Sequence, residues 1–264
     1  MAILKSSVLF TGALGDLSAY TMRGSDKVIL RRKGGPSKKR IQSAPSFENT
    51  RRLNAEFAGR STATKWIMRA LHHHRPLADH SFTGKLNALF KPIQELDTVH
   101  AWGKRSIRLT ANTSVLEGFP LNIGTTFEKM VRTPYVCEFI RETGQVTASF
   151  PTLIPDINFF PPDHPVFNLV VGAGIFPDLH YNGSAYQPIN ESVDEYVPVA
   201  VESPWYPTNE ILDPLTLTLP VPDEFIQPNT SVVITVGIKF GRMFPNGTAQ
   251  QVKNAGAGVI RLVR

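Results

Sequence analysis

A run of basic residues near the start of the chain is the set whose types and spacing point most directly to chemistry. The set comprises Arg31, Arg32, Lys33, Lys38, Lys39, Arg40, Arg51 and Arg52. The first six lie within ten positions, on both sides of the glycine pair at 34–35. Closely spaced cations can neutralise several phosphates at once, which gives salt-dependent binding without base specificity. The run therefore predicts a site for an acidic partner.

Two classes of partner fit such a run. Aromatic side chains suited to base stacking are not interleaved with it, which argues against a dedicated binder of single-stranded nucleic acid. A protein partner is favoured, nucleic acid bound through the segment 31–52 is the alternative, and a merely solvated surface is the third reading. In each case the expected interaction is electrostatic and sensitive to salt.

The charge of the chain is divided unevenly along its length. Residues 1–110 hold 20 Lys and Arg against 7 Asp and Glu, whereas residues 111–264 hold 8 against 15. The formal net charge of +6 conceals this division. Opposite charges within one chain suit the association of the basic part of one copy with the acidic part of another. We therefore expect the first partner to be the protein itself, in a homo-oligomer.

Other clusters of polar residues offer little chemistry. His72, His73 and His74, together with His80, come nearest to a metal site. Successive side chains on a helix point about 100° apart, so at most two of the three adjacent histidines can reach one ion. The Gly-Ala-Gly sequence at 172–174 lacks the third glycine and the following helix of a nucleotide-binding loop. We expect no bound metal and no cofactor.

The sequence contains no recognisable catalytic motif. The patterns Gly-x-Ser-x-Gly, His-Glu-x-x-His and Cys-x-x-Cys are all missing. Asp194 and Glu195 are adjacent, so in an extended segment their side chains would face opposite ways. We expect no catalytic residue and no enzymatic activity. A lesser possibility is carbohydrate binding by stacking on Tyr196, Trp205 and Tyr206, although such residues more often serve packing.

A predicted hairpin and a linker carry the first part of the basic run. Residues 12–33 have the pattern of a β-hairpin that turns at Arg23-Gly24-Ser25, where glycine supplies a positive φ. Residues 34–40 follow as a flexible basic linker. Such an exposed arm suits strand addition to the sheet edge of a neighbouring molecule.

Two helices are predicted after the linker. The first begins at Ser46, as its N-cap, and runs to about residue 72, because its apolar residues recur every three or four positions. The second spans about 82–96. Pro92 falls inside it and predicts a kink or a split.

From about residue 102 the sequence changes to short β-like runs separated by Pro-, Gly- and Asn-containing loops. The runs are 106–109, 115–119, 135–140, 145–150, 167–172, 196–201, 215–219, 232–240 and 258–263. Residues 215–219 alternate apolar and polar side chains strictly, as a half-buried strand does. The whole predicts an α+β fold that is mainly β. A basic module of hairpin and helices, residues 1–100, precedes a Pro-rich antiparallel β-sandwich domain, residues 101–264.

Features of the chain as a whole set further expectations. The apolar runs are shorter than the roughly 18 residues of a membrane span. The start lacks the basic region and continuous apolar core of a signal peptide, so we expect synthesis in the cytoplasm. A virion or an extracellular assembly is left open as the final location. Cys137, the single cysteine, excludes an intramolecular disulfide and is expected to be a small core residue.

Several segments of the chain are similar to a group of Bacteroidota proteins. They are Gly12-Ala-Leu-Gly15-Asp-Leu-Ser-Ala-Tyr20, the stretch from Lys38-Lys39-Arg40 to Asn49-Thr-Arg-Arg-Leu-Asn-Ala-Glu-Phe57-Ala-Gly-Arg60, Leu116-Glu-Gly-Phe119-Pro-Leu-Asn122, and residues 232–253. The resemblance spans most of the chain and implies a β-sandwich with an N-terminal hairpin and basic helix. Because the group has no assigned activity, it implies no catalytic residue.

These features together predict a non-enzymatic structural or interaction protein. We expect a subunit of a homomeric or phage-like assembly, joined by its basic N-terminal arm. The alternative is a nucleic-acid-associated protein that binds phosphates through residues 31–52. Salt-sensitive association in the absence of nucleic acid would separate the first from the second.

Overall fold

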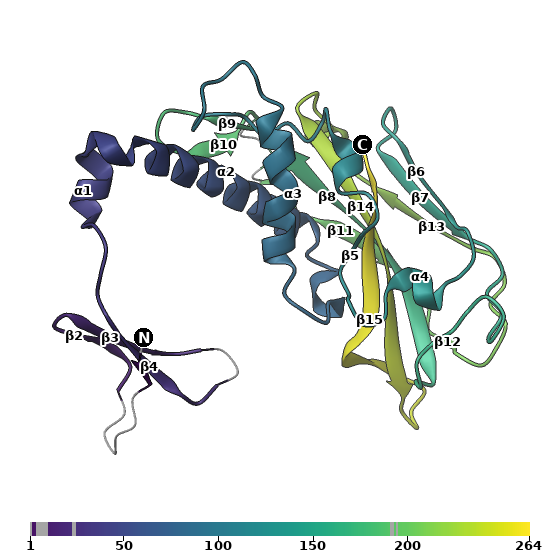
Figure 1. Ribbon diagram of the computed structural model, residues 1–264. Helices are drawn as coiled ribbons and strands as arrows, with labels where there is room; N and C mark the ends of the chain where they lie inside the picture. The colour runs from purple at the N-terminus through teal and green to yellow at the C-terminus, as the bar shows by residue number, and fades with distance from the viewer. Residues whose placement is uncertain (1, 4–9, 23–24, 191–192, 194) are drawn as a thin grey trace. The chain divides into compact units, whose positions relative to one another are not determined.

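The computed structural model describes residues 2–3, 10–22, 25–190, 193 and 195–264. The fold is α+β and mainly β, which confirms the predicted fold class. Two compact units make up the chain, Met1–Arg51 and Arg52–Arg264 (Figure 1). The sequence suggested a boundary between domains at residues 100 and 101. The compact units are defined by contacts within the structure, whereas the predicted boundary separates domains that would each fold alone. That boundary stays a prediction.

An antiparallel sheet forms most of the N-terminal unit. Its strands are β1 (Ala2–Ile3), β2 (Gly12–Leu14), β3 (Leu17–Thr21) and β4 (Val28–Arg32), in the order β1-β4-β3-β2. The pairing of β3 with β4 is antiparallel, as the predicted hairpin requires. Arg23 and Gly24 of the predicted turn lie outside the described residues. A further turn at Gly15-Asp16 joins β2 to β3, with Gly15 at φ 51°, a conformation that glycine adopts without strain.

The predicted flexible linker at 34–40 is wrong in its second half. A short helix, α1 (Lys38–Ser43), begins there, with Ser37 as its N-cap. The Ser37 hydroxyl accepts a hydrogen bond from the backbone N–H of Arg40 at 3.2 Å. Such a cap satisfies one of the donors that the first turn of a helix leaves unpaired. The cations at 38–40 therefore lie on a helix.

Two longer helices follow, close to the predicted ranges. The 3-10 turn η1 (Pro45–Phe47) leads directly into α2 (Glu48–Ala70), so the prediction of Ser46 as the N-cap is wrong. The helix α3 (Thr83–Glu95) continues through Pro92, so the predicted split is wrong as well. Ala88 and Pro92 are exposed. Water can therefore bond the Ala88 carbonyl in place of the N–H that proline lacks.

A large antiparallel sheet is the centre of the second unit. Its strands run in the order β11-β8-β14-β15-β5, and β12 also pairs with β8. The strands are β5 (Phe119–Pro120), β8 (Val166–Pro177), β11 (Val199–Glu202), β12 (Tyr206–Pro207), β14 (Thr230–Met243) and β15 (Ala249–Val263). Every residue of β8 is buried. A strand buried throughout needs cover on both faces of its sheet.

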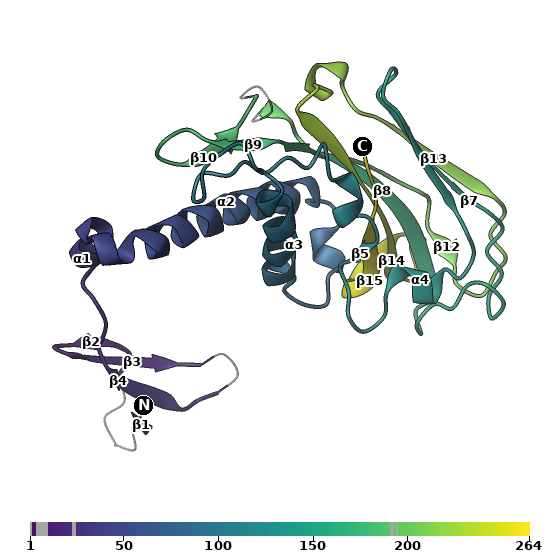
Figure 2. The ribbon, with the colours of Figure 1, turned by 45° about the horizontal axis from the view of Figure 1, so that its top comes forward.

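A small sheet and the helices supply that cover (Figures 1 and 2). The small sheet has the order β13-β7-β6, with β6 (Val136–Ile140), β7 (Gln145–Phe150) and β13 (Leu215–Pro220). It lies on one face of the large sheet, whereas α2 and α3 lie on the other. The predicted antiparallel sandwich is thus present, with a helical layer added.

Shorter elements complete the second unit. They are the strand pair β9 (Leu179–Tyr181) and β10 (Tyr186–Pro188), the helix α4 (Phe127–Met130), and the 3-10 turns η2 (Arg75–Leu77), η3 (Thr113–Val115) and η5 (Asp223–Phe225). Two predicted strands are wrong. Residues 106–109 contribute one isolated bridge, and residues 115–119 run from η3 into β5 through a turn at Gly118, which has φ 79°. Leu116 is fully buried all the same, so its apolar pattern reflected burial rather than a strand.

Glycines let the C-terminal end of α2 approach the large sheet closely. A Cβ atom on Gly174 would lie 2.3 Å from Ala70 Cα, and one on Gly172 would lie 2.8 Å from the His74 ring. On the neighbouring strand, a Cβ on Gly237 would also lie 2.8 Å from His74. Side chains cannot occupy such short distances, so glycine marks a close approach of backbone. The Gly-Ala-Gly sequence at 172–174 therefore serves helix–sheet packing.

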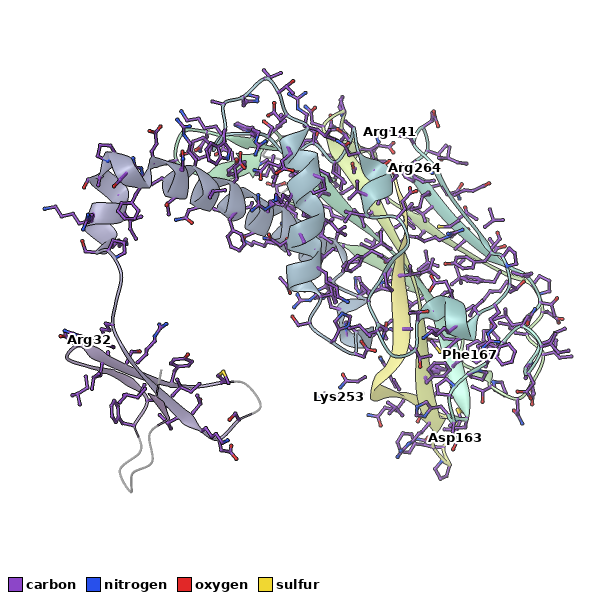
Figure 3. The ribbon with its side chains drawn as sticks, in the orientation of Figure 1. Arg32, Arg141, Asp163, Phe167, Lys253 and Arg264 are labelled. Carbon is purple, nitrogen blue, oxygen red and sulfur yellow. The ribbon has the colours of Figure 1, made fainter. Side chains whose placement is uncertain are left out.

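Aromatic rings fill much of the hydrophobic core. Between the two sheets, the ring centroids of Phe159 and Phe167 lie 4.5 Å apart, and Phe167 is labelled in Figure 3. On the helical side, Phe90 of α3 stacks on Phe176 of β8 at 5.5 Å. Helices and sheets thus share one core. Of the helices that the structure describes, none combines the length and the apolar character needed to cross a membrane.

Candidate functional site

Most of the predicted basic site lies on the N-terminal unit. Besides Arg51, its members there are Arg31 and Arg32 at the end of β4, Lys33 just after it, and Lys38, Lys39 and Arg40 at the start of α1. Every residue from 31 to 40 is exposed. Arg32 is labelled on this unit in Figure 3. We call these six side chains the basic cluster.

Local contacts of the basic cluster are few and weak. Arg32 pairs with Asp16 at 3.7 Å, with both side chains 81% exposed. An exposed pair of this kind contributes about 0–1 kcal/mol and is screened by salt. Lys33 Nζ donates to the Gly15 carbonyl at 3.0 Å, and the Arg31 guanidinium lies 5.4 Å from the centre of a tyrosine ring. These side chains therefore remain accessible to a partner.

Arg51 and Arg52 have structural roles. Arg51 donates to the carbonyls of Ile41 and Ala44 at 2.9 and 2.8 Å. Those carbonyls lie at the C-terminal end of α1, where a helix leaves acceptors unpaired. The guanidinium of Arg52 lies 5.5 Å from the centre of the Trp102 ring, within the larger unit. The geometry thus sets these two residues apart from the basic cluster.

The N-terminal sheet also carries an apolar face, which sequence reasoning missed. Leu14 pairs with Leu17 across β2 and β3, and Ala19 pairs with Leu30 across β3 and β4. Paired residues, and residues two apart on one strand, share a face of the sheet. These four residues and Val28 therefore form an apolar face, which Thr21 and Arg32 also border. Leu14 is 63% exposed and Leu17 is 37% exposed, so part of this face meets solvent.

The histidines that suggested a metal site are used separately. His72 is exposed, whereas His73 Nε2 lies 2.9 Å from the Pro198 carbonyl. His80 Nδ1 lies 2.7 Å from the aspartate that precedes it. Across the described ranges, no three His, Cys, Asp or Glu side chains are grouped so that they could hold a metal ion.

His74 fastens the end of α2 to the large sheet. Its Nδ1 lies 2.9 Å from Thr235 Oγ1, and its Nε2 lies 3.3 Å from the Val170 carbonyl. Burial lowers the pKa of His74 to about 4, and the nearby charge of Lys239 acts in the same direction. A charged imidazolium would lose its hydration at this position. His74 is therefore a neutral packing residue at pH 7.

One cluster has the composition of a hydrolase triad but not its geometry. His100 Nδ1 lies 2.7 Å from Asp97 Oδ2 and 3.5 Å from Ser106 Oγ. In a triad the carboxylate binds one ring nitrogen and the serine binds the other, whereas here both approach the same nitrogen. Burial alone would raise the pKa of Asp97, but hydrogen bonds, first among them that from the Ser106 N–H, lower it to about 2. The cluster therefore stabilises a turn.

Aromatic residues that suggested carbohydrate binding serve packing. Tyr196 is 3% exposed, and its hydroxyl donates to the Ala173 carbonyl at 3.2 Å. The Tyr206 ring lies 6.0 Å from that of Phe167. Trp205 packs on Gly241 of β14: a Cβ atom added to Gly241 would lie 2.7 Å from the Trp205 ring. The sequence favoured packing over stacking for these residues, and their contacts agree.

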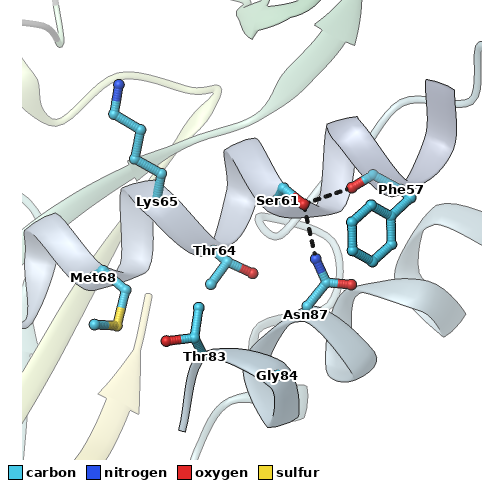
Figure 4. Close-up of a pocket in the computed structure, with 8 residues that line it drawn as sticks. All are labelled: Phe57, Ser61, Thr64, Lys65, Met68, Thr83, Gly84 and Asn87. Carbon is cyan, nitrogen blue, oxygen red and sulfur yellow. Dashed lines mark hydrogen bonds between the residues drawn. The ribbon is translucent and has the colours of Figure 1, made fainter. Parts of the chain in front are cut away.

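A groove of about 340 Å³ lies between α2 and α3 (Figure 4). Phe57 and Met68 line it from α2. Ser61 Oγ donates to the Phe57 carbonyl at 2.9 Å and accepts from Asn87 Nδ2 at 3.2 Å. The Lys65 side chain extends away from α3 in Figure 4. The groove thus has an apolar character, and its serine is already engaged within the helices.

Cys137 packs against the hydrophobic core from β6, as expected for a small core residue. Burial raises the pKa of its thiol to about 11. The thiol is therefore protonated at neutral pH, and only the thiolate is an effective nucleophile.

Comparisons of the chain with known proteins identify no relative. Neither a protein-family model, nor a curated protein, nor a solved structure matches it. The resemblance to the Bacteroidota group stays a prediction. The function must therefore be argued from the chain's own residues.

Proposed function

We propose that this protein is a non-enzymatic structural subunit that assembles with copies of itself through its N-terminal unit. The observation that carries the proposal is the small core of that unit. Among its described residues, Ala19 and Val28 alone are buried, and Leu14 and Leu17 of the apolar face are exposed. A unit of about 50 residues buries a smaller fraction of its surface than a larger domain, and very small domains commonly gain further packing by oligomerisation. A second copy supplies the missing cover.

The basic charge of the N-terminal unit favours its association with an acidic surface rather than with a second N-terminal unit. Residues 1–51 hold 10 Lys and Arg against 3 Asp and Glu. Two such units would repel each other, whereas residues 111–264 carry the acidic excess of the chain. A contact between two different surfaces is heterologous, and it generates rings or filaments when it is repeated. Such a contact suits a homomeric or phage-like assembly.

The polar clusters of the larger unit agree with a non-enzymatic role. Asp97 stabilises a turn by accepting a hydrogen bond from the Ser106 N–H, and His74 is a neutral packing residue. Perturbed titratable groups can mark active sites, but they also occur in structural networks. Asp97 borders a cavity of about 290 Å³, and its oxygens accept from the backbone N–H groups of Val99, His100 and Ser106. The contacts of these two residues belong to the second kind.

Sedimentation of the full-length chain across protein concentration and salt tests the proposal. We expect an oligomer at low salt that dissociates as the salt rises from about 0.05 to 0.5 M, because salt screens the charges at the contact. The triple change Arg31→Glu, Arg32→Glu and Lys33→Glu should abolish it. The matched control changes Lys85, Lys104 and Lys253 of the larger unit to Glu and should leave it intact. A wild-type monomer at every concentration would contradict the proposal.

Nucleic-acid binding is the second candidate, favoured by the exposure of every residue from 31 to 40. A protein that neutralises several phosphates loses affinity steeply as salt rises. Fluorescence anisotropy with labelled duplex DNA and RNA tests this candidate. Binding with a logarithmic salt slope of about −4 to −6, by a wild-type protein that stays monomeric, would favour it over self-assembly.

A further inference from the structure

We propose that the edge strand β6 of one copy is the acceptor for the N-terminal unit of a second copy. The inference rests on the proposed function and names the surface that the arm contacts. β6 is the last strand in the order β13-β7-β6, and within the part of the chain that the structure describes it pairs with β7 alone. An edge strand presents backbone N–H and C=O groups with which another strand can pair.

β6 lacks three of the features that protect edge strands, namely lysine, proline and a bulge, although it carries one exposed glutamate. Its five residues, Val-Cys-Glu-Phe-Ile, include no lysine and no proline. Its pairing with β7 runs from Val136 to Ile140 without a register shift, so no bulge twists the edge away. Val136 is 56% exposed and Ile140 is 45% exposed. An unbroken edge strand with exposed apolar side chains favours pairing with a further strand.

The surface around β6 is acidic. Glu138 lies at the centre of the strand and is exposed, and Glu142 follows in the turn to β7. A Cβ atom on Gly144 would lie 3.0 Å from Asp223 Oδ1, so Asp223 borders the same turn. β6, β7 and β13 contain no Lys or Arg. The edge of the small sheet at β6 therefore combines exposed apolar side chains with two acidic ones, Glu138 and Glu142.

Nearby cations of the same chain are engaged elsewhere. Arg141 donates to the Gln227 carbonyl at 2.6 Å. The Arg261 guanidinium lies 5.0 Å from the centre of the Tyr135 ring, and Arg264 pairs with Glu117 at 2.6 Å. Arg141 and Arg264 are both labelled at the end of this unit in Figure 3. Among the described residues, neither Glu138 nor Glu142 forms an ion pair. Their charges are therefore available to a cationic partner.

The N-terminal unit matches this surface in charge, in apolar character and in strand geometry. The basic cluster complements Glu138 and Glu142, and the exposed leucines of the apolar face complement Val136 and Ile140. β2 is itself an edge strand, so pairing of β2 with β6 would continue one sheet across two copies. A second β6 is a poorer occupant. An antiparallel pair centred on residue 138 would set two glutamates opposite each other.

Carbodiimide cross-linking of a mixture of unlabelled and ¹⁵N-labelled full-length protein tests the contact directly. The reagent joins a carboxylate to a lysine amine without a spacer, so it reports ion-pair distances. We expect mixed-isotope peptides that link Glu138 or Glu142 to Lys33, Lys38 or Lys39. Links confined to one isotope would place the contact within a single copy and overturn the inference.

Charge reversal separates failure of the acceptor from failure of assembly. We expect Glu138→Lys to weaken self-association about tenfold at low salt, because opposite charges across an interface become like charges. Glu210→Lys, an exposed change in a loop after β12, is the control and should have no effect. Mixing Glu138→Lys with the variant carrying Arg31→Glu and Arg32→Glu should restore association. One partner then supplies an intact arm and the other an intact acceptor.

Three negative results have different meanings. If the wild-type protein assembles but Glu138→Lys assembles equally well, the acceptor is not β6 and self-assembly stands. If the wild-type protein never assembles, the acceptor and the proposed function both fail. If β6 is the acceptor for another β6, cross-links to the basic cluster will be missing although Glu138→Lys alters assembly, and that outcome also overturns the inference.

Discussion

Among the described residues, the larger unit buries most of its large apolar side chains, whereas the smaller unit buries Ala19 and Val28 alone. In residues 52–264, β8 is buried from end to end and β14 over most of its length. In residues 1–51, two of the described residues are buried and ten consecutive positions, 31–40, are exposed. Stability rises with the apolar area that leaves water. The comparison therefore separates a scaffold with a large core of its own from an element with a small core, which we propose a second copy covers.

Gly174→Ala should disrupt the scaffold most severely. The added methyl group would lie 2.3 Å from Ala70 Cα, a backbone atom that cannot turn aside. We expect a loss of about 3 kcal/mol in the free energy of unfolding, since overpacking at a rigid contact lies at the upper end of its usual range. Urea unfolding measures the loss. Gly84→Ala in α3, where nothing lies within 4 Å, is the control and should not destabilise the protein; the higher helix propensity of alanine should stabilise it by up to about 1 kcal/mol.

Acid should weaken the scaffold through His74. Its pKa is about 4 in the folded protein, against the ordinary value of 6.5. The unfolded chain therefore takes up the proton first as the pH falls. The stabilisation is complete above pH 6.5 and is lost between pH 6.5 and 4, by about 3 kcal/mol in total. Urea unfolding across this range should show the full slope in the wild-type protein and in His72→Gln, and a much smaller one in His74→Gln, where only carboxylates such as Glu56 and Asp97 contribute. An equal slope in all three would contradict this role.

Glu56→Gln should lower the free energy of unfolding of the larger unit somewhat less. Glu56 pairs with Arg105 at 2.6 Å and accepts from the Gly103 N–H at 3.0 Å. Loss of the carboxylate charge leaves a poorly exposed guanidinium without its counter-ion, so we expect a loss of about 2 kcal/mol. Thermal unfolding checks the value. Glu95→Gln removes an exposed pair with Lys91 at 3.8 Å and should cost no more than about 0.5 kcal/mol.

Ser37→Ala should have the smallest effect, and it should be confined to the small unit. The serine caps α1 through the Arg40 N–H, and loss of a cap costs about 1 kcal/mol. Hydrogen exchange at the amides of α1 should become faster, whereas the melting temperature of the larger unit should not change. Ser43→Ala, at the other end of α1, is the control. A drop in the melting temperature of the larger unit would contradict the division into two units.

The local pattern of polar and apolar residues predicts the strands better than it predicts how they pack. The runs at 145–150 and 215–219 alternate in polarity, and they became β7 and β13. The glycines at 172 and 174 have no such local signature, because their role depends on Ala70 and His74, about a hundred positions away. Ser37 stands before three helix-forming residues, a pattern that by itself predicts the N-cap of α1. Gly34, Gly35 and Pro36 directly before it favour a linker instead, so the sequence predicted no helix there.

The charged part of the candidate site was predictable, whereas its apolar part was not. Six clustered cations are exposed in almost any fold, since burial of unpaired charge is costly. Whether Leu14 and Leu17 are covered depends on the strands and partners beside them. The same holds for β6, because Val136 and Ile140 become an exposed edge only through the order of strands in the small sheet. Strand order is a tertiary property that a single run of residues does not contain.

Hydrogen exchange as a function of protein concentration tests the dependence of the small unit on a second copy most directly. The backbone amides of β3 and β4 should gain protection as the concentration rises through the association range, while those of β8 and β14 should keep the same protection throughout. High salt should remove the gain. Protection of β3 and β4 that is independent of concentration and salt would show that the N-terminal unit is stable without a second copy, and would contradict the account.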